Sequence, residues 1–93
     1  MQTFIVERQL SGIQAGDLYQ MAAAAHRQAI RKRGAGARIY YLGSTFLPDD
    51  GACLCLFEAR DRALVEDLNR EANLPFLRVR AAMLLAQAPA LVV

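Results

Sequence analysis

The side chains of this chain that are suited to chemistry are few: one imidazole, His26, and the carboxylates Glu7 and Glu58, each of which closes a short apolar run. Imidazole nitrogens and carboxylate oxygens are ligands that divalent transition metals accept. Because the chain has a single histidine, any metal site needs these carboxylates, a cysteine or a second subunit. We take His26, Glu7 and Glu58 as the candidate metal ligands.

Each of these residues also has a structural interpretation. At about 100° per residue, His26 falls at the margin of the apolar stripe of its helix, where a histidine is commonly half exposed and without function. Glu7 could form an ion pair with Arg78 or Arg80 of a neighbouring strand. Alternatively, two carboxylates held close together in a poorly solvated pocket would raise the pKa of one of them, which suits a general base.

Cys53 and Cys55 are the only cysteines of the chain. Alternation along a strand puts both on one face, which we expect to be the face toward the helices. Side chains at such positions run parallel, a poor geometry for a disulfide. We therefore interpret both as reduced, small, buried hydrophobic residues, with thiolate coordination of a metal as the alternative.

Two adjacent tyrosines offer hydroxyl groups. Tyr40 and Tyr41 follow one another on a predicted strand, so they point to opposite faces of the sheet. One of them belongs to the core, and the other could line a cavity. We take Tyr41, together with Arg80 of the last strand, as the candidate residues for holding a bound small molecule.

The elements that position these residues are organised around a predicted β-hairpin. Two apolar runs, residues 38–47 and 52–58, are separated by the sequence Pro-Asp-Asp-Gly at residues 48–51. Proline fixes φ, the carboxylates accept local backbone N–H bonds, and the glycine is free to take a positive φ. The turn thus accounts for both aspartates, which could otherwise bind a hard cation.

The remaining elements follow from periodicity and from helix start and stop signals. Residues 3–8 and 76–85 read as strands, and residues 15–33 and 61–72 as amphipathic helices. Glycines at 34 and 36 end the first helix, and Pro75 follows the second. We treat the chain as a single domain of residues 1–93, with a core of residues 3–85 and a C-terminal extension of residues 86–93.

The resulting order, βαββαβ, predicts an α+β ferredoxin-like sandwich with strand order 4-1-3-2 and both helices on one face of the sheet. We expect the central strands to be parallel, which would place Glu7 and Glu58 side by side on the uncovered face. Apolar residues make up 55% of the chain, a high share for a small domain. We therefore expect two sheets to pack face to face as a homodimer, a dimeric α+β barrel.

Composition argues against two classes of partner. The net charge of +2 gives no strong electrostatic attraction to nucleic acid. The basic triplet at residues 31–33 is explained by the carbonyl end of its helix, although a phosphate-binding patch is the alternative. No apolar run reaches the ~20 residues of a membrane helix, and no signal peptide is evident, so we expect a cytoplasmic protein.

Three segments carry a resemblance to a known family: YLGSTFLPDDGACLCLFEA, TFIVER near the start, and NLPFLRV after the second helix. Together they cover roughly residues 3–82 and resemble a family of small bacterial proteins, long labelled a domain of unknown function, that is similar to a nickel-binding, dimeric ferredoxin-like protein. The resemblance implies a dimeric α+β barrel and Ni²⁺ as the cofactor. It does not imply an enzyme. Many members carry a histidine about where Gly43 stands here.

We therefore expect a small non-catalytic homodimer that binds a divalent transition metal, nickel by resemblance. The alternative is a dimeric α+β barrel that binds or transforms a small organic ligand in a cavity between sheet and helices, as cofactor-free oxygenases and isomerases do. A purely structural interaction module is the third possibility.

Overall fold

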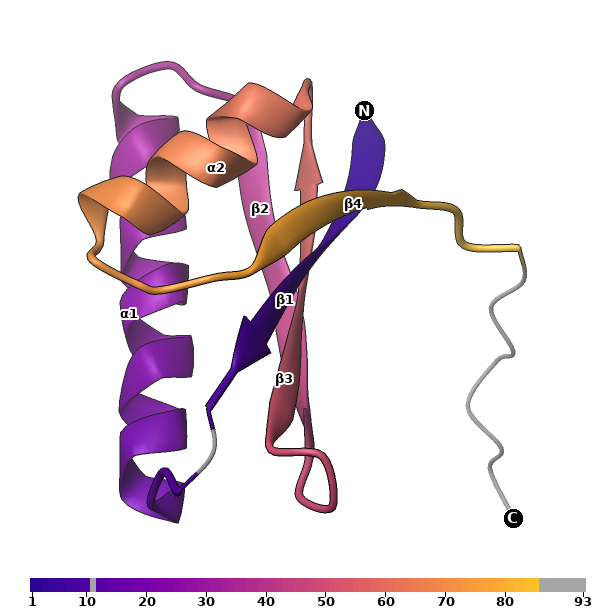
Figure 1. Ribbon diagram of the computed structural model, residues 1–93. Coiled ribbons are helices and arrows are strands. Elements are labelled where there is room, and N and C mark those ends of the chain that lie inside the picture. Colours follow the sequence, from indigo (N-terminus) through magenta and orange to yellow (C-terminus); the bar gives the residue numbers. More distant parts are fainter. Residues whose placement is uncertain (11, 86–93) are drawn as a thin grey trace, which may run out of the picture.

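The structure is a computed structural model that describes residues 1–10 and 12–85. Its elements occur in the predicted order βαββαβ, and the α+β ferredoxin-like fold is confirmed (Figure 1). The elements are β1 (Gln2–Gln9), α1 (Ala15–Gly34), β2 (Ile39–Leu47), β3 (Ala52–Ala59), α2 (Arg62–Glu71) and β4 (Arg78–Ala82). The last strand is shorter than predicted, and the expected extension, residues 86–93, lies outside the described residues.

The four strands form one sheet in the order β2-β3-β1-β4, which is the predicted strand order. All three neighbouring pairs are antiparallel, so the prediction of a parallel central pair was wrong. The physical reason lies in the connections. The crossover through α1 makes β1 and β2 run in the same direction, and the hairpin then reverses the chain, so that β3 runs against β1.

This reversal separates the two carboxylates that the sequence had placed side by side. Glu7 pairs with Leu54, whereas Glu58 pairs with Thr3 at the other end of the central strands. The two pairs are four residues apart along β1, which is about 13 Å along the sheet at ~3.3 Å per residue. The predicted adjacency of Glu7 and Glu58 is therefore wrong, although both side chains do lie on the same face.

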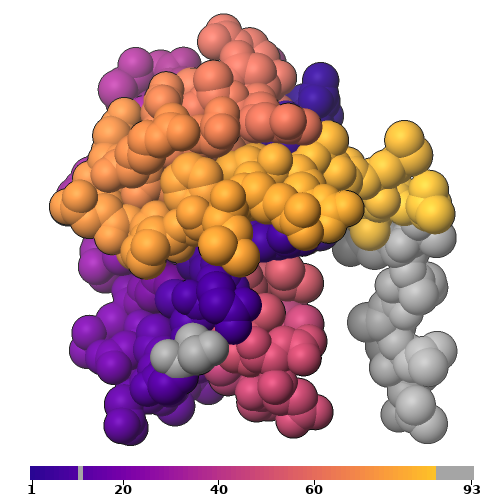
Figure 2. Space-filling view, in the orientation of Figure 1, coloured from indigo at the N-terminus to yellow at the C-terminus, as the bar shows by residue number. Residues whose placement is uncertain are grey.

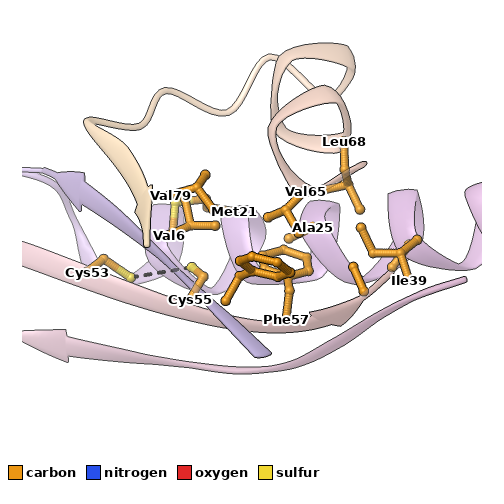
Figure 3. Packing of buried hydrophobic residues seen from close by; sticks show 13 residues of the cluster. Val6, Met21, Ala25, Ile39, Cys53, Cys55, Phe57, Val65, Leu68 and Val79 are labelled. Carbon is orange, nitrogen blue, oxygen red and sulfur yellow. Dashed lines mark hydrogen bonds between the residues drawn. The ribbon is translucent and has the colours of Figure 1, made fainter. Parts of the chain in front are cut away.

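Both helices cover one face of the sheet, and the hydrophobic core lies between them and that face (Figures 1 and 3). Along β3 the burial alternates strictly, with every second residue buried. The buried residues of α1 are small or flexible, which lets the helix approach the sheet closely. The buried apolar residues are Phe4, Val6, Met21, Ala25, Ala29, Ile39, Cys53, Cys55, Phe57, Ala59, Val65, Leu68 and Val79.

The predicted hairpin is confirmed, but it contains a β-bulge. Tyr41 and Gly43 pair with consecutive residues of β3, so Leu42 is the extra residue. Gly43 has a φ of 146°, a backbone conformation that residues with a side chain rarely adopt. The bulge shifts the alternation of the strand, with the result that Tyr41 and Ser44 point to the same face.

The other face of the sheet is covered by none of the described residues. We call it the open face; β1 contributes Thr3, Ile5 and Glu7 to it, and β3 contributes Leu54, Leu56 and Glu58.

Beyond β4, three large apolar side chains are strongly exposed, and this segment projects from the body of the molecule (Figure 2). They are Met83, Leu84 and Leu85. None of the helices in the described ranges is long and apolar enough to cross a bilayer.

Candidate functional site

Glu7 forms the ion pairs with Arg78 and Arg80 of β4 that its structural interpretation predicted. Its carboxylate accepts hydrogen bonds from Arg78 Nε and, at 3.0 Å, from Arg80 Nη1. Hydrogen bonding to Arg78, and then to Arg80, holds the pKa of Glu7 below its ordinary value. Because both oxygens already accept from guanidinium groups, Glu7 is the poorer of the two carboxylate candidates for binding a metal.

Glu58 differs from Glu7 in having no such partner. It is half-buried on the open face, where its cross-strand neighbours are Thr3 and Tyr40. Within residues 1–10 and 12–85 its carboxylate forms no ion pair. A half-buried carboxylate without a counter-charge costs free energy of solvation, and a cation would offset that cost.

His26 lies on the other side of the sheet from both carboxylates. It is exposed on α1 and packs against Tyr41, with the ring centroids 5.7 Å apart. The structure thus does not bring His26, Glu7 and Glu58 together within one chain. No group of three His, Cys, Asp or Glu side chains among the described residues could hold a metal ion, so the described part of one chain does not fit a nickel centre by itself.

Tyr41 lines a pocket between α1 and the hairpin of β2 and β3. The pocket has a volume of about 390 Å³, within the ~300–1,000 Å³ range of small-molecule sites. The Tyr41 hydroxyl lies 2.5 Å from Ser44 Oγ, and burial raises the pKa of Tyr41 above its ordinary value. The lining residues are Ala15, Leu18, Tyr19, Ala22, Tyr41, Ser44, Phe46 and Cys53.

Arg80, the second residue expected at a small-molecule site, does not share this pocket. It lies on the open face with Glu7 and borders a separate hollow of about 360 Å³. Since Tyr41 faces the helices, the sheet separates the two residues. One small molecule therefore cannot contact both Tyr41 and Arg80 of the same chain.

The two cysteines form a close pair on the helix-covered face. Both are free and buried, as predicted, and their sulfurs are 4.0 Å apart (Figure 3). Ser44 Oγ donates a hydrogen bond to Cys55 Sγ at 2.9 Å. Burial, and secondarily the neighbouring Cys55, raises the pKa of Cys53 to about 11. At neutral pH, Cys53 is therefore a thiol.

Arg8 is a buried cation that the sequence interpretation missed. Its side chain is 1% exposed, and it donates to Asn69 Oδ1 at 2.5 Å, to the Pro75 carbonyl at 3.1 Å and to Cys55 Sγ at 3.4 Å. No carboxylate within the described ranges pairs with it. The alternation Phe4, Val6, Arg8 along β1 was the signal that placed this residue on the core face.

These features define a class: a small ferredoxin-like α+β domain with an open sheet face on one side and a pocket with buried thiols on the other. A family model described as "Nickel responsive protein SCO4226-like" matches residues 4–81. The chain therefore belongs to the SCO4226-like family of nickel responsive proteins.

A solved structure supports the same fold. The chain is similar to the crystal structure of SCO4226 from Streptomyces coelicolor A3(2), with a TM-score of 0.74 and 20% sequence identity. The similarity covers 90% of this chain and 99% of that one. At this identity the likeness concerns the fold alone. Among curated proteins, none matches the chain.

Proposed function

We propose that the protein is a non-catalytic homodimer that binds a divalent transition metal, nickel by its family, at a site completed by the second subunit. The observation that carries the proposal is the carboxylate of Glu58 on the open face, which forms no ion pair with any residue that the structure describes. The family description supports nickel as the ion. The cellular location in this proposal is the cytoplasm, a reducing compartment that preserves free thiols such as Cys53 and Cys55.

The open face supports the dimer because it carries aliphatic side chains, and because Arg78 and Arg80 are already paired with Glu7. Ile5 and Leu56 are cross-strand partners there, and Leu54 lies beside them, each only half-buried within its own chain. Packing two copies face to face would remove these side chains from water, at a gain of ~25 cal/mol for each Å² of apolar surface. A two-fold interface uses the same patch on both subunits, so each copy brings its own Glu58.

Burying two carboxylates in one interface is unfavourable unless their charge is neutralised. A divalent cation cancels the charge of two carboxylates and accepts oxygen ligands. We therefore assign nickel to Glu58 of both subunits, with water or further side chains completing the coordination. The other candidate ligands, Glu7 and His26, are less suited to this site. The Glu7 carboxylate is already paired with Arg78 and Arg80, and His26 lies on the helix-covered side of the sheet.

Isothermal titration of EDTA-stripped protein with Ni²⁺ tests the proposal. We expect saturable binding at micromolar concentrations, its loss in Glu58→Gln, and its retention in the matched surface variant Glu66→Gln and in His26→Ala. Sedimentation of the same samples should give a dimer. Absence of saturable heat, or binding that survives Glu58→Gln but not His26→Ala, would overturn the assignment to the open face.

A second candidate function rests on the pocket at Tyr41. Its lining is mostly apolar, and the hydroxyl groups of Tyr41 and Ser44 supply a polar end, which is the usual composition of a site for a small organic molecule. Ligand-observed NMR with 1-naphthol as the probe tests it. We expect Ala22→Phe, which fills the pocket, to abolish binding, and the exposed control Ala23→Phe to leave it unchanged. Equal binding by both variants would exclude the pocket.

A further inference from the structure

The cysteine pair has a geometry that suits one shared metal ion. Cys53 and Cys55 point to the same side of β3, and their sulfurs are 4.0 Å apart (Figure 3). With metal–sulfur bonds of about 2.3 Å, two sulfurs on one ion lie roughly 3.8 Å apart at the tetrahedral angle and roughly 4.6 Å apart in a linear arrangement. The observed separation falls between these two values, so chelation requires little movement of the strand.

The buried cation next to the pair indicates which charge the bound ion carries. Arg8 directs Nε toward Cys55 Sγ and has only neutral partners among the described residues. Two thiolates and one monovalent ion together carry a single negative charge, which the guanidinium cancels. A divalent ion on the same two thiolates would leave the charge of Arg8 unbalanced in the core, and uncompensated buried charges are costly.

The pair also has a route to solvent. Cys53 contributes to the lining of the pocket at Tyr41, which opens between α1 and β2. An ion entering there passes the hydroxyl groups of Tyr41 and Ser44, and Ser44 already donates to Cys55. The thiols are therefore buried against their own chain and yet reachable through this pocket.

We propose that Cys53 and Cys55 form a binding site for a monovalent soft metal ion, Cu⁺ in the cell, whose charge is balanced by Arg8. Thiolate ligands select Cu⁺. On binding, each thiol loses its proton, two S–Cu bonds form, and both protons pass to solvent, with no change in oxidation state. The site is independent of the proposed nickel function, because it lies on the opposite face of the sheet and uses none of the same residues.

A competition titration under argon tests the proposal on the reduced full-length chain, with Cu⁺ supplied in the presence of bicinchoninate. We expect the chain to withdraw one Cu⁺ from the chelator, and X-ray absorption to show sulfur ligands only. Cys53→Ala and Cys55→Ala should each weaken binding by about 100-fold or more, because each removes one of the two ligands. Val6→Ala, which deletes buried volume beside Cys55 without removing a sulfur, is the matched control and should bind normally.

The role of Arg8 has its own readout. Arg8→Lys retains the charge and should bind Cu⁺ nearly as the parent does, whereas Arg8→Gln should bind about tenfold more weakly. Circular dichroism on each variant verifies folding. Unchanged affinity in Cys53→Ala, nitrogen or oxygen ligands in the absorption spectrum, or failure of the parent to compete with the chelator would overturn the proposal. A parallel Ni²⁺ titration of Cys53→Ala should match the parent, so each proposal can fail separately.

Discussion

The buried pair formed by Arg8 and Asn69 allows a quantitative prediction about stability. Asn69 is fully buried, accepts from Arg8 Nη2 at 2.5 Å and donates to the Val65 carbonyl at 2.7 Å. A hydrogen bond from a charged group contributes ~1.5–3 kcal/mol, and a neutral one ~1 kcal/mol. Replacing Asn69 by the similarly sized Leu should therefore lower the free energy of unfolding by about 2–3 kcal/mol, after the gain from the added apolar surface.

The partner substitution completes a double-mutant cycle. Arg8→Met removes the charge but leaves Asn69 Oδ1 and the Pro75 carbonyl without a donor, at a cost of about 3 kcal/mol. In the double variant fewer buried polar groups lack a hydrogen-bond partner, because two apolar side chains replace the polar pair. We expect its cost to fall short of the sum of the single costs by about 2 kcal/mol.

Urea unfolding at one fixed chain concentration measures these costs, and calorimetry should show melting temperatures about 8–24 °C lower for the single variants, at ~4–8 °C per kcal/mol in a domain of this size. Arg27→Met, on the exposed side of α1, is the matched control and should stay within ~0.5 kcal/mol of the parent. Single costs below ~1 kcal/mol, or costs that simply add, would refute the reasoning that Arg8 depends on this network.

Three further predictions concern single features. Asp61→Ala removes the cap that accepts from the Leu64 amide and should cost about 1 kcal/mol in urea unfolding, whereas Asp67→Ala should not. The folded-state pKa of Glu7 is lowered, so its contribution to stability is present above the ordinary value of 4.5 and is lost as the pH falls through the folded pKa. When the free energy of unfolding is measured against pH in the acid range, Glu7→Gln should therefore show a weaker pH dependence than the parent. An unchanged pH dependence contradicts this prediction. Gly43→His forces a side chain onto a φ of 146° and should lower stability by about 1–3 kcal/mol, with parent-like melting as the opposing result.

Local signals were sufficient to predict the elements but not the geometry of the central strands. The turn residues at 48–51 and the glycines at the end of α1 act over a few positions, and the corresponding boundaries agree with the structure to within one or two residues. The direction of β3 relative to β1 depends instead on the crossover and the hairpin taken together. Because the relative direction of β1 and β3 was predicted wrongly, the shared face of Glu7 and Glu58 was predicted correctly but their adjacency was not.

The β-bulge in β2 shows where simple alternation along a strand fails to predict the face to which a side chain points. Strict alternation places Tyr41 and Ser44 on opposite faces, because they are three residues apart. The extra residue Leu42 brings them together and makes the hydrogen-bonded link from the pocket to Cys55. Gly43 was the only local indication of the irregularity. Arg8 was missed for another reason: its position in the alternation was readable, but its charge argued against burial.

The two proposed sites place two kinds of metal ligand on opposite faces of the sheet. The open face presents carboxylate oxygen from Glu58, a ligand suited to a divalent ion. The covered face presents Cys53 and Cys55 beside a guanidinium, a setting that favours a soft ion of lower charge. Because the sheet lies between the two sets of ligands, one ion cannot use both. Under the two proposals, the ligands of each face therefore decide which metal binds there, and substitutions on one face should leave binding at the other unchanged.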